Sequence, residues 1–166
     1  MPIFIAIPIF GTLLLIQTTI ASRVFLLHGT VDLFLLVFLA WALQKRVNTG
    51  WHWTIIGSLM LTITSALPFG AMFIGYGLST GVAIFLKKRI WQIPLIAMFV
   101  VTFIGTLITH GISLTVLRVV GNPLPINLAF SQVTIPSLVL NLLLAVPIYA
   151  LISDLAGLVY PEPIET

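Results

Sequence analysis

Few side chains in this sequence have the chemistry of a reactive centre, and they stand far apart along the chain. The acidic residues are Asp32, Asp154, Glu162 and Glu165, and the histidines are His28, His52 and His110. Glycine-rich phosphate loops and the HExxH and GxSxG motifs are absent. Without cysteine the chain has no disulfide, thiol nucleophile or iron–sulfur ligand. We therefore predict no catalytic residue, no cofactor and no metal site.

The isolated ionisable residues suggest structural roles. Asp32 stands at a predicted helix start, where we expect a helix cap or an interface anchor, with a partner contact or a substrate ligand as the alternatives. Asp154 is expected to cap a helix end or to pair with a basic cluster. Arg118 is expected to reach toward lipid headgroups. His110 is expected to be a hydrogen-bonded structural residue rather than a ligand.

Two amides lie inside otherwise apolar segments. Gln17 is near the end of the first segment and Asn141 is inside the last one. Such side chains often form hydrogen bonds between helices, typically contributing about 0.6 kcal/mol. We expect both amides to join neighbouring helices.

The composition indicates an integral membrane protein. Of the 166 residues, 60% are hydrophobic and only 7% are charged, whereas soluble domains carry about 25% charged residues. This number of charged residues is too small to solvate a globular surface. Most of the surface must therefore face lipid. The fold predicted is an all-α bundle of six transmembrane helices forming one domain over residues 1–160, with a short acidic cytoplasmic tail at 161–166.

Six apolar segments carry this prediction. The first has no cation before Arg23, which favours a membrane helix over a signal peptide. Trp51, His52 and Trp53 form an aromatic cluster suited to the headgroup interface. Residues 22–30 and 119–130 are expected to be loops, the second because of its glycine and prolines. The segments are 3–21, 31–43, about 51–67, 69–86, 93–117 and 133–158.

Basic residues at the ends of two segments predict the orientation. Five of the seven cations form two clusters, and placing both clusters inside puts both termini in the cytoplasm. Such clusters are typical topology anchors, so the net charge of +3 does not indicate nucleic-acid binding. This topology places His52 near the inner face, and His28 and His110 near the outer face. The anchors are Lys45, Arg46, Lys87, Lys88 and Arg89.

The stretch Leu67–Arg89 reads as the central packing helix. Gly70, Gly77 and Gly81 recur at steps of seven and four, and the last two form a GxxxG pair. Small residues at this spacing allow two helix backbones to approach closely in a membrane. We expect a packing face, either within the protein or against a partner.

The order of these features resembles the rod shape-determining protein MreD family. The stretch Leu15–Thr19 resembles the family's first helix ending, and Val31–Leu36 resembles its Pro-Asp-Leu-Leu-Leu opening of helix two. The strongest match begins with Ser65–Gly70, which contains Pro68. It continues through Gly75, Tyr76 and Gly77 and ends with the basic residues Lys87–Arg89. Asp32 is a further family-motif position. Val31 replaces the family's usual proline, and Thr62 stands where many members have an acidic residue.

The resemblance implies a non-enzymatic scaffold in the bacterial inner membrane. MreD-like proteins associate with MreC and, through it, with the RodA glycosyltransferase, a penicillin-binding transpeptidase and the MreB filament. The family's fold is similar to that of energy-coupling-factor transporter S-components, so a vitamin-binding subunit is the alternative. A third hypothesis, a lipid-acting enzyme, rests on Asp32, His110 and Arg118 lying near one surface. The sequence leaves homo-oligomer formation open.

Overall fold

The computed structural model describes residues 2–20, 23, 25–65, 67–68, 70–89 and 93–161. This part of the chain is mostly helical, so the predicted all-α class is confirmed. Its elements are α1 (Pro2–Thr19), β1 (Phe25–Leu26), β2 (Gly29–Thr30), α2 (Leu33–Leu43), α3 (Gly50–Thr64), α4 (Ala71–Lys87), α5 (Pro94–Val119), α6 (Ile126–Leu128), the π-helix η2 (Ala129–Thr134) and α7 (Ile135–Val159).

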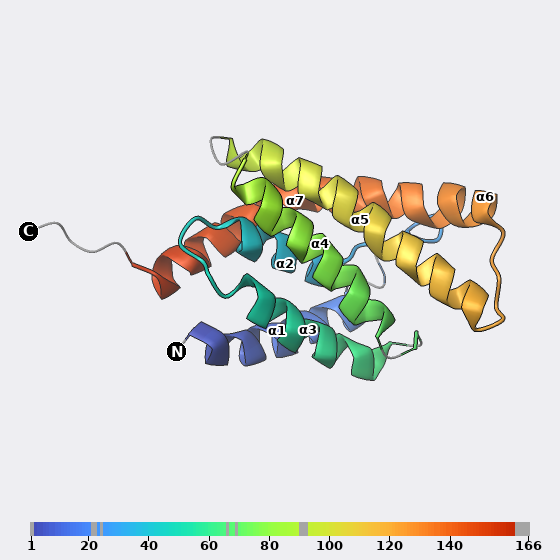
Figure 1. Ribbon diagram of the computed structural model, residues 1–166, viewed down its shortest axis with the longest axis horizontal. Helices are drawn as coiled ribbons and strands as arrows, with labels where there is room; N and C mark the ends of the chain where they lie inside the picture. The colour runs from blue at the N-terminus through green and yellow to red at the C-terminus, as the bar shows by residue number, and fades with distance from the viewer. Residues whose placement is uncertain are drawn as a thin grey trace, which may run out of the picture.

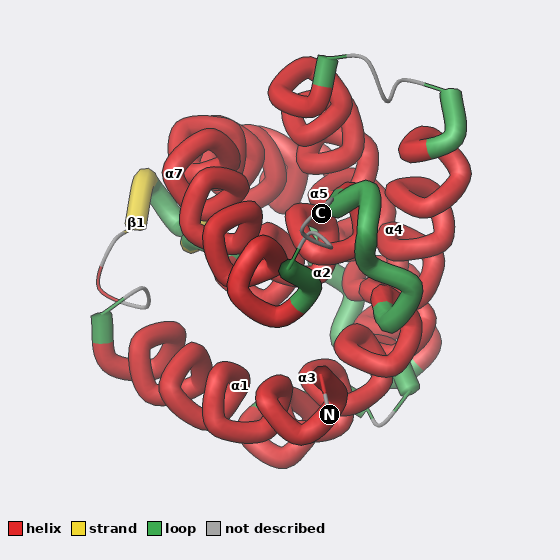
Figure 2. The backbone as a smooth tube through the Cα atoms, turned by 90° about the vertical axis from the view of Figure 1, so that its left-hand side faces the viewer, coloured by secondary structure: helices red, strands yellow, loops and turns green. Residues whose placement is uncertain are grey.

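The long helices lie side by side along the long axis of the molecule (Figure 1). Helices α1 and α3 form one side of the bundle, and α4, α5 and α7 form the other (Figure 2). Helix α2 lies between them and contacts all five of these helices. Helix α1 begins and α7 ends at the same end of the molecule (Figure 1).

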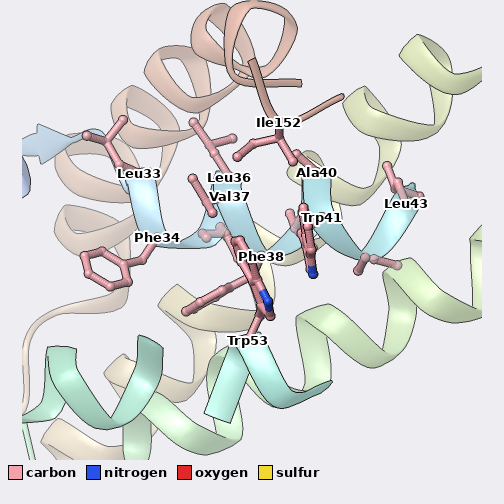
Figure 3. Close-up of a cluster of buried hydrophobic side chains, with 14 of the residues drawn as sticks. Leu33, Phe34, Leu36, Val37, Phe38, Ala40, Trp41, Leu43, Trp53 and Ile152 are labelled. Atoms are coloured by element: carbon pink, nitrogen blue, oxygen red, sulfur yellow. The ribbon is translucent and has the colours of Figure 1, made fainter. Parts of the chain in front are cut away.

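Helix α2 is the core of the bundle. All of its 11 residues are buried, and its sequence LFLLVFLAWAL is apolar on every face, as expected of a helix surrounded by protein. Figure 3 shows Phe38 and Trp41 projecting from it toward Trp53 of α3. The ring of Phe10 on α1 packs against Phe34, Phe38 and Trp53.

The sequence prediction for Trp53 was wrong. It was grouped with Trp51 and His52 as an interface residue, but its side chain is fully buried. Trp51 is 47% exposed and His52 is also exposed. Residues two apart on a helix point in directions about 200° apart, so Trp53 faces the core while Trp51 faces outward.

Among the described residues, two helical stretches are long and apolar enough to cross a membrane, Pro94–Val119 and Ile126–Val159. Helix α2 would extend only about 16 Å at 1.5 Å per residue, against a hydrocarbon core of about 30 Å. The prediction of six transmembrane spans therefore stays a prediction. Large apolar side chains are exposed on the outer helices, among them Phe4, Ile63, Leu143 and Leu158, which agrees with a membrane location.

Two predicted loops contain regular structure. Residues 25–30 form a short antiparallel hairpin in which Phe25 pairs with Thr30 and Leu26 with Gly29. In the second loop a helix begins at Ile126 and continues through η2 into α7. The prediction of a loop to residue 130 was therefore wrong. Pro125 is the residue immediately before this helix, a place where its fixed φ does not interrupt the helical hydrogen bonds.

Candidate functional site: a polar cavity at the start of helix α2

Helix α2 begins inside the bundle, so its first amide groups need protein acceptors. Asp32 supplies one of them, because its Oδ1 accepts a hydrogen bond of 2.9 Å from the Leu35 amide. The prediction of a cap at Asp32 is confirmed.

Gln17 of α1 satisfies two more backbone groups. Its Nε2 donates to the Val31 carbonyl at 2.7 Å, and its Oε1 accepts from the Leu33 amide at 2.9 Å. One amide side chain thus binds the backbone on both sides of Asp32. The predicted interhelical role of Gln17 is confirmed.

Asn141 of α7 satisfies one more backbone group at the start of α2. Its Oδ1 accepts from the Asp32 amide at 2.8 Å, and its Nδ2 donates to Thr106 Oγ1 of α5 at 3.1 Å. Its side chain is fully buried, so an unpaired amide there would cost about 1–3 kcal/mol. Its predicted interhelical role is also confirmed.

Hydrogen bonds also fix the hairpin before α2 to η2 and to the start of α7. The Thr30 amide donates to Ser137 Oγ at 3.0 Å, and the His28 amide donates to the Gln132 carbonyl at 3.1 Å. A Cβ atom on Gly29 would lie 2.5 Å from the Ser137 amide nitrogen. Only glycine allows this approach without a shift of the backbone.

Tyr76 of α4 binds the second oxygen of Asp32. Its hydroxyl donates to Asp32 Oδ2 at 2.9 Å, and the tyrosine is 4% exposed. Both oxygens of the carboxylate therefore accept a hydrogen bond, one from the helix that it caps and one from a neighbouring helix.

A cavity of about 430 Å³ lies beside this network; we call it the polar cavity. It is lined where α1 and α3 end and where α4 begins, and its described lining contains one carboxylate and neither lysine nor arginine. It has the size and the mixture of groups of a small-molecule pocket. The residues are Gln17, Thr18, Thr30, Val31, Asp32, Leu61, Thr64, Ser65, Met72, Tyr76 and His110.

His110 has a structural partner although it lines the polar cavity. Its Nδ1 lies 3.1 Å from Thr134 Oγ1, which agrees with the structural role predicted for it. Arg118, the third member of the lipid-enzyme hypothesis, is exposed in the last turn of α5 and is not among the described lining residues. Within the described part of the chain, no group of three or more His, Asp or Glu residues could hold a metal ion.

The glycines of the predicted packing face have different surroundings. Gly70 lies just before α4 with φ of 108°, a conformation that favours glycine. Gly75 lies against Thr109 of α5, since its Cβ would be 3.5 Å from the Thr109 Cα, and a Cβ on Gly81 would be 3.3 Å from the Trp51 ring. A Cβ on Gly77 would meet nothing within 4 Å, so this glycine faces open space.

The other predicted positions lie away from the polar cavity. The basic residues from the α2–α3 connection and the end of α4 gather at the opposite end of the bundle, where Lys45 and Lys87 line common cavities. Asp154 is exposed on α7. Glu162 and Glu165 lie outside the described residues.

The sequence interpretation missed Thr106, Thr134 and Ser137, three hydroxyl residues of the network. A signal for the first of them was present. Thr102, Thr106, Thr109 and Ser113 recur every three or four residues and therefore share one face of α5. Such a polar stripe in an apolar helix indicates a face directed toward other polar groups rather than lipid.

No family model, no curated protein and no solved structure matches this chain.

Proposed function

We propose that this protein is a non-enzymatic membrane scaffold of the MreD type, which joins MreC to the peptidoglycan synthases of the cell-elongation complex. The observation that carries the proposal is the hydrogen bond between Asp32 and Tyr76. These residues belong to two separate stretches of the resemblance, around positions 31–36 and 65–77, and they meet at one place.

Other motif positions support the same proposal. Ser65 lines the cavity beside Asp32 and Tyr76. Gly70, two residues after Pro68, lies just before α4 with a positive φ, which explains why a glycine stands at this position. Both carboxylate oxygens of Asp32 are hydrogen-bonded within the protein. These residues therefore stabilise the fold of the bundle, and this role requires no chemical reaction.

Helix α4 offers a surface for a partner. Ile74 and Leu78 are exposed on it, and the space beside Gly77 is open. A second helix could approach the backbone closely at that glycine. We propose that MreC, or another membrane helix of the complex, packs there.

The scaffold proposal is tested by purification of the tagged protein from native membranes in mild detergent, with mass spectrometry of what is bound. We expect MreC with RodA and the transpeptidase. The variant Gly77→Ile should lose them, and Gly111→Ile is the matched control, because Gly111 also lies within a helix with nothing within 4 Å of its Cβ. Recovery of none of these partners by the unmodified protein would overturn the scaffold proposal. Equal recovery by both variants would overturn the placement of the partner on α4.

The polar cavity favours a second candidate function, the substrate-binding subunit of a vitamin transporter. Its volume and its hydrogen-bonding groups suit a small polar ligand. Thermal unfolding of the purified protein with a panel of water-soluble vitamins tests this function. A saturable stabilisation, together with recovery of paired ATPases from native membranes, would favour it over the scaffold. A panel without effect would count against it.

A further inference from the structure

The carboxylate of Asp32 lines the polar cavity without a basic side chain of this protein beside it. All seven lysines and arginines of the chain are among the described residues, and none of them lines this cavity. Arg23 and Arg118, which stand outside the two basic clusters, are both exposed. The described wall of the cavity therefore contains a negative group and no lysine or arginine to balance it.

The hydrogen bonds of Asp32 fit an ionised carboxylate. Its Oδ1 accepts from the Leu35 amide and its Oδ2 accepts from the Tyr76 hydroxyl, whereas a protonated carboxyl group would donate from one oxygen. A carboxylate has about four lone-pair positions, so these bonds leave room for a further donor. A charge away from water also needs compensation, and a cation in the cavity would supply it.

The rest of the lining suits an organic cation rather than a metal ion. Leu61 and Met72 give the cavity apolar walls, and Thr30 and Ser65 add neutral hydroxyl groups. The volume of about 430 Å³ lies in the range of about 300–1,000 Å³ that is usual for small-molecule sites. Among the described residues, no group of three or more His, Asp or Glu could hold a metal ion. The lining thus points to a molecule that carries both a cationic group and an apolar part.

The polar cavity opens at the surface of the bundle. Three of its lining residues, Thr18, Thr30 and Thr64, are exposed, whereas Leu61 and Tyr76 are buried. The exposed threonines therefore mark its mouth. The two basic clusters lie at the opposite end of the bundle, so a cation that enters here does not have to pass them.

We propose that the polar cavity binds a small organic molecule through a protonated amine, which donates to the Asp32 carboxylate while the apolar part of the molecule lies against Leu61 and Met72. This inference names the class of ligand for the second candidate function, and it rests on that function only in placing a ligand in this cavity. It does not require that the protein act as a scaffold.

Phenethylamine is a suitable probe, and phenylethanol is its uncharged match of similar size. Isothermal titration calorimetry of the purified protein in an uncharged detergent measures the binding of each. At about pH 8 a histidine with an ordinary pKa is neutral, while an alkylamine stays protonated as a lysine side chain does. We expect saturable binding of the amine and about tenfold weaker binding of the alcohol, the ratio expected for one charge-assisted hydrogen bond. Equal binding of the two probes, or no saturable binding of the amine, would overturn the inference.

Asp32→Asn tests the carboxylate with little change of shape. Asparagine is an equally good helix cap, and the Tyr76 hydroxyl can accept a hydrogen bond from its amide. We expect amine binding about tenfold weaker, with binding of the alcohol unchanged. Asp154→Asn is the matched control, because Asp154 is exposed and is not among the described lining residues. Equal affinities for the amine in the two variants would overturn the assignment to Asp32.

A cation introduced at the mouth gives a result even if Asp32→Asn does not fold. Thr64 is exposed there, so Thr64→Lys places an ammonium that repels a cationic ligand. We expect about tenfold weaker binding of phenethylamine, whereas Thr64→Gln, which adds length without charge, should retain it. Equal loss in both variants would overturn the role of charge. Binding of a vitamin without a cationic group, with the same affinity in the unmodified protein and in Asp32→Asn, would keep the second candidate function and overturn this inference.

Discussion

Trp41 and Trp53 stack with their ring centroids 3.8 Å apart and their planes inclined by 16°. Both side chains are fully buried, and the Phe10 ring packs edge-on against Trp53 at 5.4 Å. Such aromatic pairs contribute about 0.5–1.5 kcal/mol beyond the area that they bury. This stack joins α2 to α3, and Phe10 adds α1 to the same cluster.

Replacing Trp53 by alanine should lower the free energy of unfolding by about 3–5 kcal/mol, because it leaves a cavity beside Trp41 and Phe10. Trp51→Ala is the matched control and should cost much less, since Trp51 is 47% exposed. Denaturant unfolding in mixed micelles measures both changes. Equal losses in the two variants would contradict the placement of Trp53 in the core.

The sequence predicted the helical class, the cap at Asp32 and the hydrogen-bonding roles of Gln17 and Asn141. The cap and the two amide roles each follow from one polar residue in an otherwise apolar stretch, because an unpaired polar group in such a place is too costly. It could not predict that α2 is buried on every side. The run Leu33–Leu43 is apolar throughout, and a lipid-facing helix and a protein-enclosed helix share that pattern.

The polar cavity was also beyond prediction. Its lining comes from α1, α3, α4, α5 and the segment before α2, and a one-dimensional pattern does not say which helices are neighbours. The burial of Trp53 was missed for a similar reason. Trp51 and Trp53 are equally suited to an interface by type, and only the packing of α3 against α2 distinguishes them.

The Asp32–Tyr76 hydrogen bond can be measured by a double-mutant cycle. Tyr76→Phe leaves Asp32 Oδ2 without its donor, so we expect a loss of about 1–3 kcal/mol in the free energy of unfolding. In an Asp32→Ala background the same change should cost clearly less, because the acceptor is already gone. Additive losses would contradict a direct interaction.

An exposed carboxylate provides the control for this cycle. Asp154 is exposed on α7, and Asp154→Ala should change stability by no more than about 0.5 kcal/mol. Together the measurements separate the effect of the bond from the general effect of removing a negative charge.

Asn141→Leu should destabilise the protein by about 1–3 kcal/mol, since it keeps a similar volume but leaves the part-buried Asp32 amide without an acceptor. Thr106 Oγ1 loses its donor in the same variant. Asn122→Leu is the matched control in an exposed connection. Hydrogen exchange at the Asp32 amide measures the loss of this hydrogen bond directly. Unchanged protection of that amide in Asn141→Leu would contradict its hydrogen bond to Asn141.

Glycine substitutions distinguish packing inside the bundle from the open face of α4. A Cβ on Gly57 would lie 2.5 Å from the Phe38 ring, so Gly57→Ala should destabilise the isolated protein by about 1–3 kcal/mol through overpacking. Gly77 lies within a helix and faces open space, so Gly77→Ala should stabilise the helix by about 0.5–1 kcal/mol. Denaturant unfolding of the purified protein gives both values. A loss of stability in Gly77→Ala would place another part of this chain against that glycine, and the α4 face would then not be available to a partner.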